Sequence, residues 1–430
     1  MTNDSQSFGS VNVASGRQRV TEGFAELLVP LLKDMPFARE LSLDLGYRYS
    51  HYNQSGNNST YKADVSWVPV SGLRFRGGYS RAVRAPSLGN LYGPTTVGNL
   101  NIGTGPNAGD PCAVGSVFRG GASATQVQAL CLAQGIPAAI YPTYTYGSVS
   151  VQGSDGSNIG LKPEKADTYS IGAVITPKFD TPLLRNFQVS VDYYSIKIAG
   201  AIGSLLLTDI LPRCFNSDGI SNTAYSVNNA YCQRIKRDPL TGGIILGQQG
   251  LFNFATYTVR GIDAQIGWRT SLDGLGLSGD AGTLDFNTII SYLKDYKVAG
   301  LLGSPTLNYA GSIGYAGVGG DISHPRWKAY TGVTYSNGPF STGLRWRYID
   351  EMMHSDRVAN AAATTPGVSS YSYFDIDAHY VINHQFTIGA GLTNLTDRAP
   401  PFVSAASLTT DAAAYDVVGR TYFVSLKAKF

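Results

Sequence analysis

The last eleven residues of the chain, "RTYFVSLKAKF" (Arg420–Phe430), alternate strictly between two kinds of side chain. Apolar side chains occupy one set of alternate positions, at Tyr422, Val424, Leu426, Ala428 and Phe430. Polar side chains occupy most of the others, at Thr421, Ser425, Lys427 and Lys429, with Phe423 as the exception. A period of two predicts a β-strand whose two faces meet different surroundings. Because chain ends usually fray, a complete strand at this end implies a neighbour in a sheet.

The same alternation recurs along most of the 430-residue chain. With the terminal segment, we count about thirteen predicted strands. The other twelve are Arg17–Val29, Leu41–Tyr49, Tyr61–Trp67, Leu73–Ser80, Tyr169–Thr176, Phe187–Tyr193, Gly261–Arg269, Leu284–Tyr292, Trp327–Tyr335, Phe340–Tyr348, Phe374–Ile382 and Phe386–Leu395. Alternation that is repeated in segments of about ten residues is typical of transmembrane β-barrels.

The kinds of residue on the two faces favour a membrane barrel over a soluble all-β fold. Aromatic residues such as Tyr61, Trp67 and Trp327 lie near the ends of the apolar stretches, as membrane interfaces select. Charged residues occupy the alternate positions, and we expect them to face a water-filled lumen: Arg74, Arg76, Arg345, Arg347, Asp375 and Asp377. The sequence therefore predicts an all-β, antiparallel transmembrane barrel, with a soluble all-β protein as the alternative.

The lengths of the links between strands support the barrel and orient it. Short or modest links alternate with long ones, and the long links run over about Val83–Pro163, Ala201–Leu251, Ala299–His324, Met353–Ser370 and Leu395–Val418. Only Asn53–Asn57 is short where the alternation requires a long link. Outer-membrane barrels have short periplasmic turns and long extracellular loops. We therefore expect the last strand to run toward the periplasm.

Composition excludes other classes of protein. Charged residues make up 15% of the chain, against about 25% in typical soluble domains. The net charge of +3 is too small to predict nucleic acid as a partner. The sequence has no apolar run of roughly 18 residues that would predict a membrane helix. The first twenty residues lack the apolar segment of a signal peptide, which by itself would indicate the cytoplasm.

The four cysteines form two local pairs, Cys112 with Cys131 and Cys214 with Cys232. Each pair lies within one long link, and both links belong to the predicted extracellular side, which is oxidising. We therefore predict two loop disulfides; free thiols or a metal site are the alternatives, although the spacings do not match zinc motifs. Each disulfide would restrict a loop of about twenty residues, worth roughly 3 kcal/mol in the chain-entropy model.

Four segments, in order, resemble the TonB-dependent outer-membrane receptors: "GYSRAVRAPSLGNLY" (Gly78–Tyr92), "LKPEKADTYSIG" (Leu161–Gly172), "GLTNLTDRAPP" (Gly391–Pro401) and the terminal "VGRTYFVSLKAKF". The resemblance implies a barrel of 22 strands around an N-terminal plug. It also implies uptake of a scarce nutrient, of the siderophore-iron, cobalamin, haem or glycan class. Energy would come through TonB, which grips a segment ahead of the plug.

The predicted thirteen strands are fewer than the family's barrel requires. We therefore expect residues 1–430 to be the C-terminal barrel part of such a receptor, with Met1 as an internal start, without a plug and unable to fold alone. Its implied location is the outer membrane of a Gram-negative bacterium. Its implied partners are membrane lipid, TonB through the missing plug, and a small-molecule or oligosaccharide ligand. The terminal aromatic Phe430 resembles the signal read by the barrel assembly machinery.

Few residues carry a prediction about ligands. Tyr141, Tyr144 and Tyr146 in a long link could stack on sugars or aromatic chelates. Arg81 and Arg84 could contact an anionic ligand or the plug, although solvated charges at a strand exit are the simpler interpretation. The segment "DEMMHSDR" (Asp350–Arg357) could bind a metal or haem, although an ordinary loop is the simpler interpretation.

The sequence predicts no catalytic residue, no cofactor and no metal site. The function is therefore predicted to be that of a transport receptor and not of an enzyme. An outer-membrane barrel enzyme and a passive porin are the alternatives.

Overall fold

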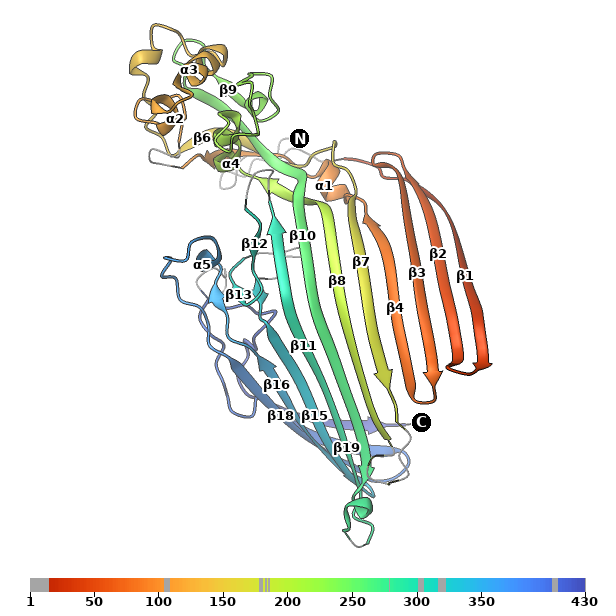
Figure 1. Cartoon of the computed structure of the whole chain (residues 1–430). Helices are drawn as coiled ribbons and strands as arrows, with labels where there is room; N and C mark the ends of the chain where they lie inside the picture. Colours follow the sequence, from red (N-terminus) through yellow and green to blue (C-terminus); the bar gives the residue numbers. More distant parts are fainter. Residues whose placement is uncertain are drawn as a thin grey trace.

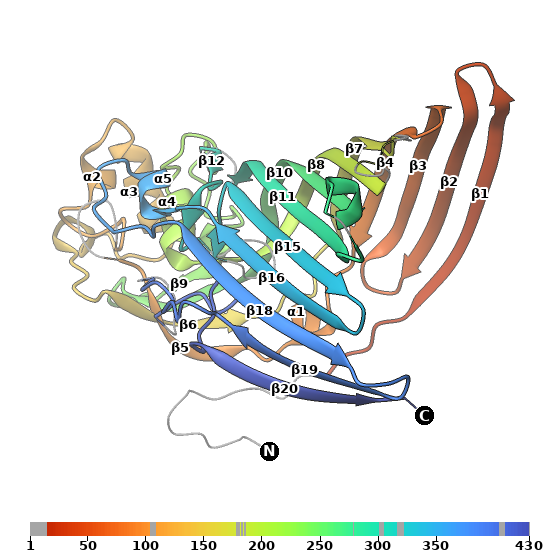
Figure 2. The ribbon, with the colours of Figure 1, turned by 90° about the horizontal axis from the view of Figure 1, so that it is seen from below.

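The computed structural model describes residues 15–103, 109–177, 181, 184, 186–277, 279–300, 305–315, 322–403 and 409–429. Within these residues, thirteen long strands pair side by side in one curved antiparallel sheet (Figures 1 and 2). In spatial order they are β1 (Val20–Met35), β2 (Ala38–Tyr52), β3 (Gly56–Val70), β4 (Leu73–Arg84), β7 (Glu164–Ile175), β8 (Asn186–Leu205), β10 (Ile244–Ser271), β11 (Thr283–Ala299), β15 (Trp327–Asn337), β16 (Phe340–Ile349), β18 (Tyr371–Val381), β19 (Phe386–Thr393) and β20 (Thr421–Ala428). All thirteen predicted strands are confirmed.

Short and long connections lie at opposite ends of the sheet, as predicted. The ends of β3 and β4, of β15 and β16, and of β18 and β19 are joined by short turns at one end, which we call the turn end. Long loops leave the other end, the loop end, except for the three-residue link between β2 and β3. The strand register fixes this arrangement, because each hairpin pairs from its turn outward.

The two faces of the sheet carry different kinds of side chain, and this difference is kept from one strand to the next. Val65 of β3 pairs with Leu43 of β2 and Gly77 of β4, whereas the next position pairs Asp64 with Asp44 and Gly78. The register thus keeps apolar residues on one face, the apolar face, and charged residues on the other, the polar face. Aromatic rings meet across strands near both ends of the apolar face, for example Tyr79 with Tyr169 at 4.7 Å and Trp67 with Phe75 at 5.5 Å.

The two edge strands of the sheet each have one partner strand within the described residues: β1 pairs with β2, and β20 pairs with β19. The strand near Arg17–Val29 differs from the prediction, because β1 continues through the expected link and turns only after Met35. The register shifts between Pro30 and Leu32, and a bulge at a strand edge tolerates a proline. Phe430 lies outside the described residues.

The long loops contain the remaining elements. The helices are α1 (Leu88–Tyr92), α2 (Val117–Gly120), α3 (Ala124–Ala133), α4 (Leu207–Cys214), α5 (Asp356–Ala359) and the 3₁₀ turns η1 (Tyr141–Thr143), η3 (Cys232–Arg234) and η4 (Leu272–Leu275). The short strands are β5 (Thr96–Asn101), β6 (Ser150–Gly156), β9 (Ile235–Arg237), β12 (Leu307–Asn308), β13 (Ser312–Ile313), β14 (Ser323–His324) and β17 (Met353–His354). No helix in the described part of the chain is long and apolar enough to cross a membrane.

Candidate functional site: a polar sheet face below a two-loop cap

Ion pairs cross from strand to strand on the polar face. The guanidinium of Arg76 donates to the Asp192 carboxylate, with Nε and Oδ1 2.7 Å apart, and Lys62 Nζ lies 2.8 Å from Asp44 Oδ2. Farther along the sheet, Arg345 pairs with Asp377. Arg347 Nη2 lies 2.6 Å from Asp416 Oδ2, and its Nε lies 3.4 Å from Asp375 Oδ2. The lumen-facing charges predicted from the sequence therefore lie together on one face, except that Arg74 has no ion pair among the described contacts.

A glycine makes one of these pairs geometrically feasible. Arg76 on β4 and Asp192 on β8 are separated by Gly172 on β7, which is in register with both residues. A Cβ atom on Gly172 would lie 2.0 Å from Asp192 Oδ1. The missing side chain is therefore what lets the carboxylate and the guanidinium meet across an intervening strand.

The polar face also carries a groove of about 770 Å³ near the turn end. Its polar lining includes both signs of charge: Asp44, Asp64, Asp192, Arg74 and Arg76, with Ser170 beside them. Such a wall suits water, a polar ligand or a polar protein segment, and does not suit hydrocarbon.

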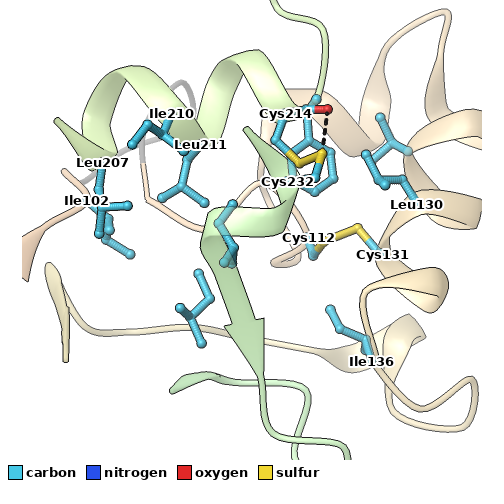
Figure 3. Packing of buried hydrophobic residues seen from close by; sticks show 14 of the residues in the cluster. Ile102, Cys112, Leu130, Cys131, Ile136, Leu207, Ile210, Leu211, Cys214 and Cys232 are labelled. Atoms are coloured by element: carbon cyan, nitrogen blue, oxygen red, sulfur yellow. Dashed lines mark hydrogen bonds between the residues drawn. A yellow bond between two sulfur atoms is a disulfide. The ribbon is translucent and has the colours of Figure 1, made fainter. Parts of the chain in front are cut away.

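The described residues of the two longest loops, 85–103 with 109–163 and 206–243, fold together over the loop end of the sheet, and we call this unit the cap (Figure 1). One buried apolar cluster contains residues of both loops, with Ile102, Val127 and Leu130 from the first and Ile210, Leu211 and Phe215 from the second. Figure 3 labels Ile102, Leu130, Ile210 and Leu211 of this cluster. The first residues of β10 extend into the cap, where they pair with β6 and β9.

Both predicted disulfides are present in the cap. Cys112 is joined to Cys131 and Cys214 to Cys232, and all four residues are buried in the shared cluster (Figure 3). Each bond closes a segment within a single loop, so neither disulfide ties one loop to the other. The contact between loops therefore rests on noncovalent packing.

A fully buried ion pair joins the two loops of the cap. Arg237 of the second loop donates from Nη1 and Nη2 to the two carboxylate oxygens of Asp110 in the first, at 2.6 and 2.7 Å, and both side chains have no exposed surface. Tyr144 OH donates to the same carboxylate at 2.8 Å, and the Cys112 backbone N–H donates at 2.9 Å. The remaining donors of Arg237 reach the Gly242 carbonyl and the Gln134 side chain.

The titration behaviour of the cap follows from this arrangement. Burial raises the pKa of the Tyr144 phenol, and the negative charge of Asp110 raises it further. Burial works to lower the pKa of Arg237, but the charge of Asp110 and its hydrogen bonds outweigh it, so the pKa of the guanidinium is raised. At neutral pH the Tyr144 phenol therefore stays neutral and the Arg237 guanidinium stays charged.

A pocket of about 500 Å³ with an uncharged lining opens between the two cap loops. Phe118 and Val127 of the first loop line it together with Pro212, Phe215 and Tyr225 of the second, and its lining has no charged side chain. Ser123, Asn216 and Ser217 add polar groups to the lining, so the pocket suits an uncharged molecule with both apolar and polar parts, in contrast with the charged groove on the polar face.

Loops at the other side of the sheet form a second small core against the polar face. It contains Ile313, Ile349, Met352, Val368, Tyr373, Val403 and Tyr415. Next to it, aromatic rings stack in pairs: Tyr309 on Tyr315 at 3.8 Å and Tyr296 on His324 at 4.1 Å. Tyr257 of β10 meets Tyr296 edge-on at 6.2 Å. The described residues of these loops therefore pack together at the loop end of the sheet.

The two arginines predicted as ligand contacts lie on opposite faces of the sheet. Arg81 shares the apolar face with Tyr79, and its Nε lies 2.7 Å from Asp167 Oδ1 on β7. Arg84, three positions later, is on the polar face and pairs with Glu164. Both arginines pair with a carboxylate, the side chain of Arg84 is also 61% exposed, and only Arg84 lies on the polar face.

The three predicted tyrosines lie within the cap. Tyr141 is 7% exposed with Arg119 stacked 3.9 Å from its ring centre, and Tyr144 is 4% exposed beside Asp110. Tyr146 is half-buried, and its hydroxyl donates to the Ser150 carbonyl at 3.3 Å. The rings of Tyr141 and Tyr144 thus serve as packing, and Tyr146 keeps more surface for a ligand.

The segment Asp350–Arg357 is divided between the second core and solvent. Met352 is buried in that core, Met353 is exposed, and His354 Nδ1 lies 3.1 Å from Asp356 Oδ2. Asp350, Glu351 and Arg357 line a groove of about 450 Å³. Across the described residues, no three His, Cys, Asp or Glu side chains are grouped so that they could hold a metal ion.

Sequence reasoning missed the ion pair between Asp110 and Arg237 and the stacked rings around Tyr309. The two charged residues are 127 positions apart and carry no motif. One signal was available: both lie in the same long links as the cysteine pairs, which indicates that these links are ordered.

Comparisons with known proteins agree with this architecture. A family model described as "TonB dependent receptor-like, beta-barrel" matches residues 2–395. The ferric enterobactin receptor of Pseudomonas aeruginosa, solved as a point mutant with enterobactin, superposes with a TM-score of 0.58 at 17% identity, over 96% of this chain and 46% of that one. The siderophore receptor PirA of Acinetobacter baumannii gives a TM-score of 0.56 at 14% identity, over 96% and 46%.

The chain spans less than half the length of these solved receptors, and no curated protein matches its sequence. At these identities the superpositions establish the fold alone, whereas the family model covers most of the chain. The chain therefore belongs to the TonB-dependent receptor β-barrel family.

Proposed function

We propose that this chain is the barrel part of an outer-membrane receptor that imports a scarce nutrient with energy from TonB. The observation that carries the proposal is the pairing of a charged sheet face with an ordered, disulfide-bonded cap over its loop end. A charged wall provides a passage for a polar cargo, and an ordered cap provides a shaped surface on which to capture it. Family membership supports the same function.

The siderophore-iron class is the cargo we favour, with cobalamin, haem and glycans as the other classes. This choice is supported by the siderophore receptors among the proteins with a similar fold. The uncharged cap pocket is suited to the aromatic or aliphatic part of such a chelate, and the basic residues of the polar face to its charge. Arg84 and Tyr146 are the proposed contacts among the residues predicted from the sequence.

The test uses the complete receptor that carries this chain, produced in outer membranes. Uptake of radiolabelled ferric siderophores, cobalamin, haem and oligosaccharides is measured before and after a protonophore collapses the inner-membrane energy. We expect uptake of one class and its loss on collapse. Uptake that persists without energy would identify a passive porin, and chemical conversion of the added compound would identify an enzyme.

Two variants test the proposed contacts. Arg84→Gln and Tyr146→Ala should weaken binding of the imported compound, whereas Lys165→Gln, which removes an exposed cation from the apolar face of the neighbouring strand β7, should not. Equal affinities in all three variants would remove Arg84 and Tyr146 from the binding site while leaving the transport function standing.

A further inference from the structure

The apolar face of the sheet carries an unexpected group of charges near its loop end. Residues in direct register across five strands are Arg81, Asp167, Lys197, Thr258 and Lys297. Lys165 lies two positions from Asp167, Arg260 two positions from Thr258, and Asp295 is the register partner of Arg260. We call the charged residues of this set the cation belt: Arg81, Lys165, Lys197, Arg260 and Lys297, with Asp167 and Asp295.

Strand alternation places the belt on the apolar face. Asp167 alternates with Tyr169 and Ile171, which are 57% and 65% exposed, and Arg260 alternates with Ile262. No register shift interrupts the pairing of β8 with β10 between Tyr257 and Arg269. The pairing of β10 with β11 does shift between Arg260 and Gly261, and this shift places Asp295 and Lys297 opposite Arg260 and Thr258, on the same face. The belt therefore shares a surface with the side chains that face hydrocarbon in a membrane barrel.

An aromatic row marks the level of the belt. Tyr79 and Tyr169, whose ring centres are 4.7 Å apart, lie next to Arg81 and Asp167 on the turn-end side. Tyr292 and Trp327, whose ring centres are 4.5 Å apart, lie on the turn-end side of Asp295 and Lys297. Such rings lie where hydrocarbon meets the polar headgroups. The belt lies just beyond them, at the level of the headgroups.

The belt has more positive than negative charge. The belt contains five cations and two carboxylates, and each carboxylate already pairs with at least one of these cations. Asp167 pairs with Arg81 at 2.7 Å, and Asp295 lies 3.2 Å from Lys297 Nζ and 3.7 Å from Arg260 Nη1. Lys197 is exposed between these two pairs, and no ion pair is recorded for it among the described contacts. The side chains of Arg260 and Lys297 keep 41% and 40% of their surface exposed.

We propose that the cation belt binds the phosphate of an outer-leaflet lipid headgroup. Guanidinium and ammonium groups that converge on one surface suit the charge and the acceptor oxygens of a phosphate. Basic residues near a membrane surface attract anionic lipid, by about fivefold in affinity for each residue. A lipid fits better than a soluble anion, because its acyl chains lie on the apolar face that carries the belt. The inference rests on the proposed outer-membrane location.

The experiment uses the complete receptor in detergent, folded as judged by heat-modifiable gel migration. Native mass spectrometry measures retention of dioleoylphosphatidic acid and, separately, of dioleoylphosphatidylcholine, whose phosphate is masked by choline. The variant removes Lys197, Arg260 and Lys297 together as K197Q/R260Q/K297Q. The matched control is Lys328→Gln, which removes a cation from the opposite face at the same end of the sheet.

We expect the wild-type receptor to prefer phosphatidic acid, the triple variant to lose that preference on the order of 100-fold, and the control to retain it. Asp295→Asn, which frees two cations, should increase retention. Unchanged retention in a folded triple variant would overturn the inference. Displacement of the lipid by millimolar inorganic phosphate would also overturn it, because the belt would then be a site for soluble anions.

A folded receptor that fails this test can still import its cargo, and a receptor that imports nothing can still retain the lipid. The energised-uptake assay and the lipid assay therefore fail independently.

Discussion

Replacement of Arg237 by methionine tests whether the buried ion pair holds the two cap loops together. Arg237→Met keeps most of the side-chain volume but removes the guanidinium that donates to Asp110 at 2.6 and 2.7 Å. Both side chains have no exposed surface, so the Asp110 carboxylate would remain buried without its counter-charge. Loss of one partner of a buried pair costs about 3–5 kcal/mol.

The structure places the expected cost at the lower end of that range. Asp110 accepts four recorded hydrogen bonds, and two of them, from Tyr144 OH and the Cys112 backbone N–H, survive the substitution. We therefore expect the free energy of opening the cap to fall by about 3 kcal/mol. At 1.4 kcal/mol per tenfold, the open cap becomes about 100 times more populated.

Hydrogen–deuterium exchange in the complete receptor measures this change. Amides of α3 and α4, one from each cap loop, should exchange about 100-fold faster in Arg237→Met, under conditions where exchange reports the opening equilibrium. Amides in the middle of β8 should not change. Lys236→Met is the matched control, because Lys236 is the exposed neighbour of Arg237 on β9.

A second variant separates the ion pair from simple loss of packing. Asp110→Asn combined with Arg237→Met leaves no buried charge, so the pair of substitutions should cost less than the sum of the two single ones. The reasoning is refuted if α3 exchanges at the wild-type rate in Arg237→Met, or if the two costs simply add.

Three further outcomes are expected. Cys112→Ser with its partner cysteine replaced should reduce the stability of the cap by about 3 kcal/mol, seen as faster trypsin cleavage in the first loop; an unchanged cleavage rate would show that packing alone orders this loop. Gly172→Ala should lower the thermal midpoint of the folded receptor in detergent, because its Cβ would meet Asp192 Oδ1, whereas Gly23→Ala has no atom within 4 Å and should be neutral; equal midpoints would contradict the close approach. Burial acts to raise the pKa of Asp218, but hydrogen bonds from Ser221 and its neighbours outweigh burial and hold this pKa below its usual range. The ionised carboxylate therefore stabilises the second loop above about pH 4, and this contribution is lost as the pH falls through the lowered pKa. Proteolysis of the second loop should be faster at pH 3 than at pH 5, and Asp218→Asn should abolish the difference.

The regular part of the fold could be predicted because its signal is local. Alternate residues of a strand point to opposite faces, so a strand between hydrocarbon and water carries its pattern in its own sequence. β3 is an example, with Tyr61, Val65 and Trp67 on one face and Lys62 and Asp64 on the other. The prediction failed at the end of β1, because the strand predicted to end at Val29 continues through Pro30 to Met35. An edge strand has no hydrogen-bond partner on one side, so a proline there need not end it.

The candidate site could be predicted only in part. The cysteine pairs were predictable, because a short separation within one loop identifies the partner of each cysteine. The faces of Arg81 and Arg84 also follow from their odd separation within β4, a consequence of alternation that the sequence interpretation did not use. The burial of Tyr141 and Tyr144 depends on the second loop folding over the first, and nothing near these residues in the sequence indicates it.

The sequence by itself determined the strands, the two faces, the ends that carry long loops, and the resemblance to a receptor family. Each of these depends on residues within one strand or one link. Only the tertiary structure decided that two loops share one core, that Asp110 meets Arg237, and that cations from five strands converge on the apolar face. The physical reason is that strand register, set by pairing between distant segments, determines which loops and side chains become neighbours.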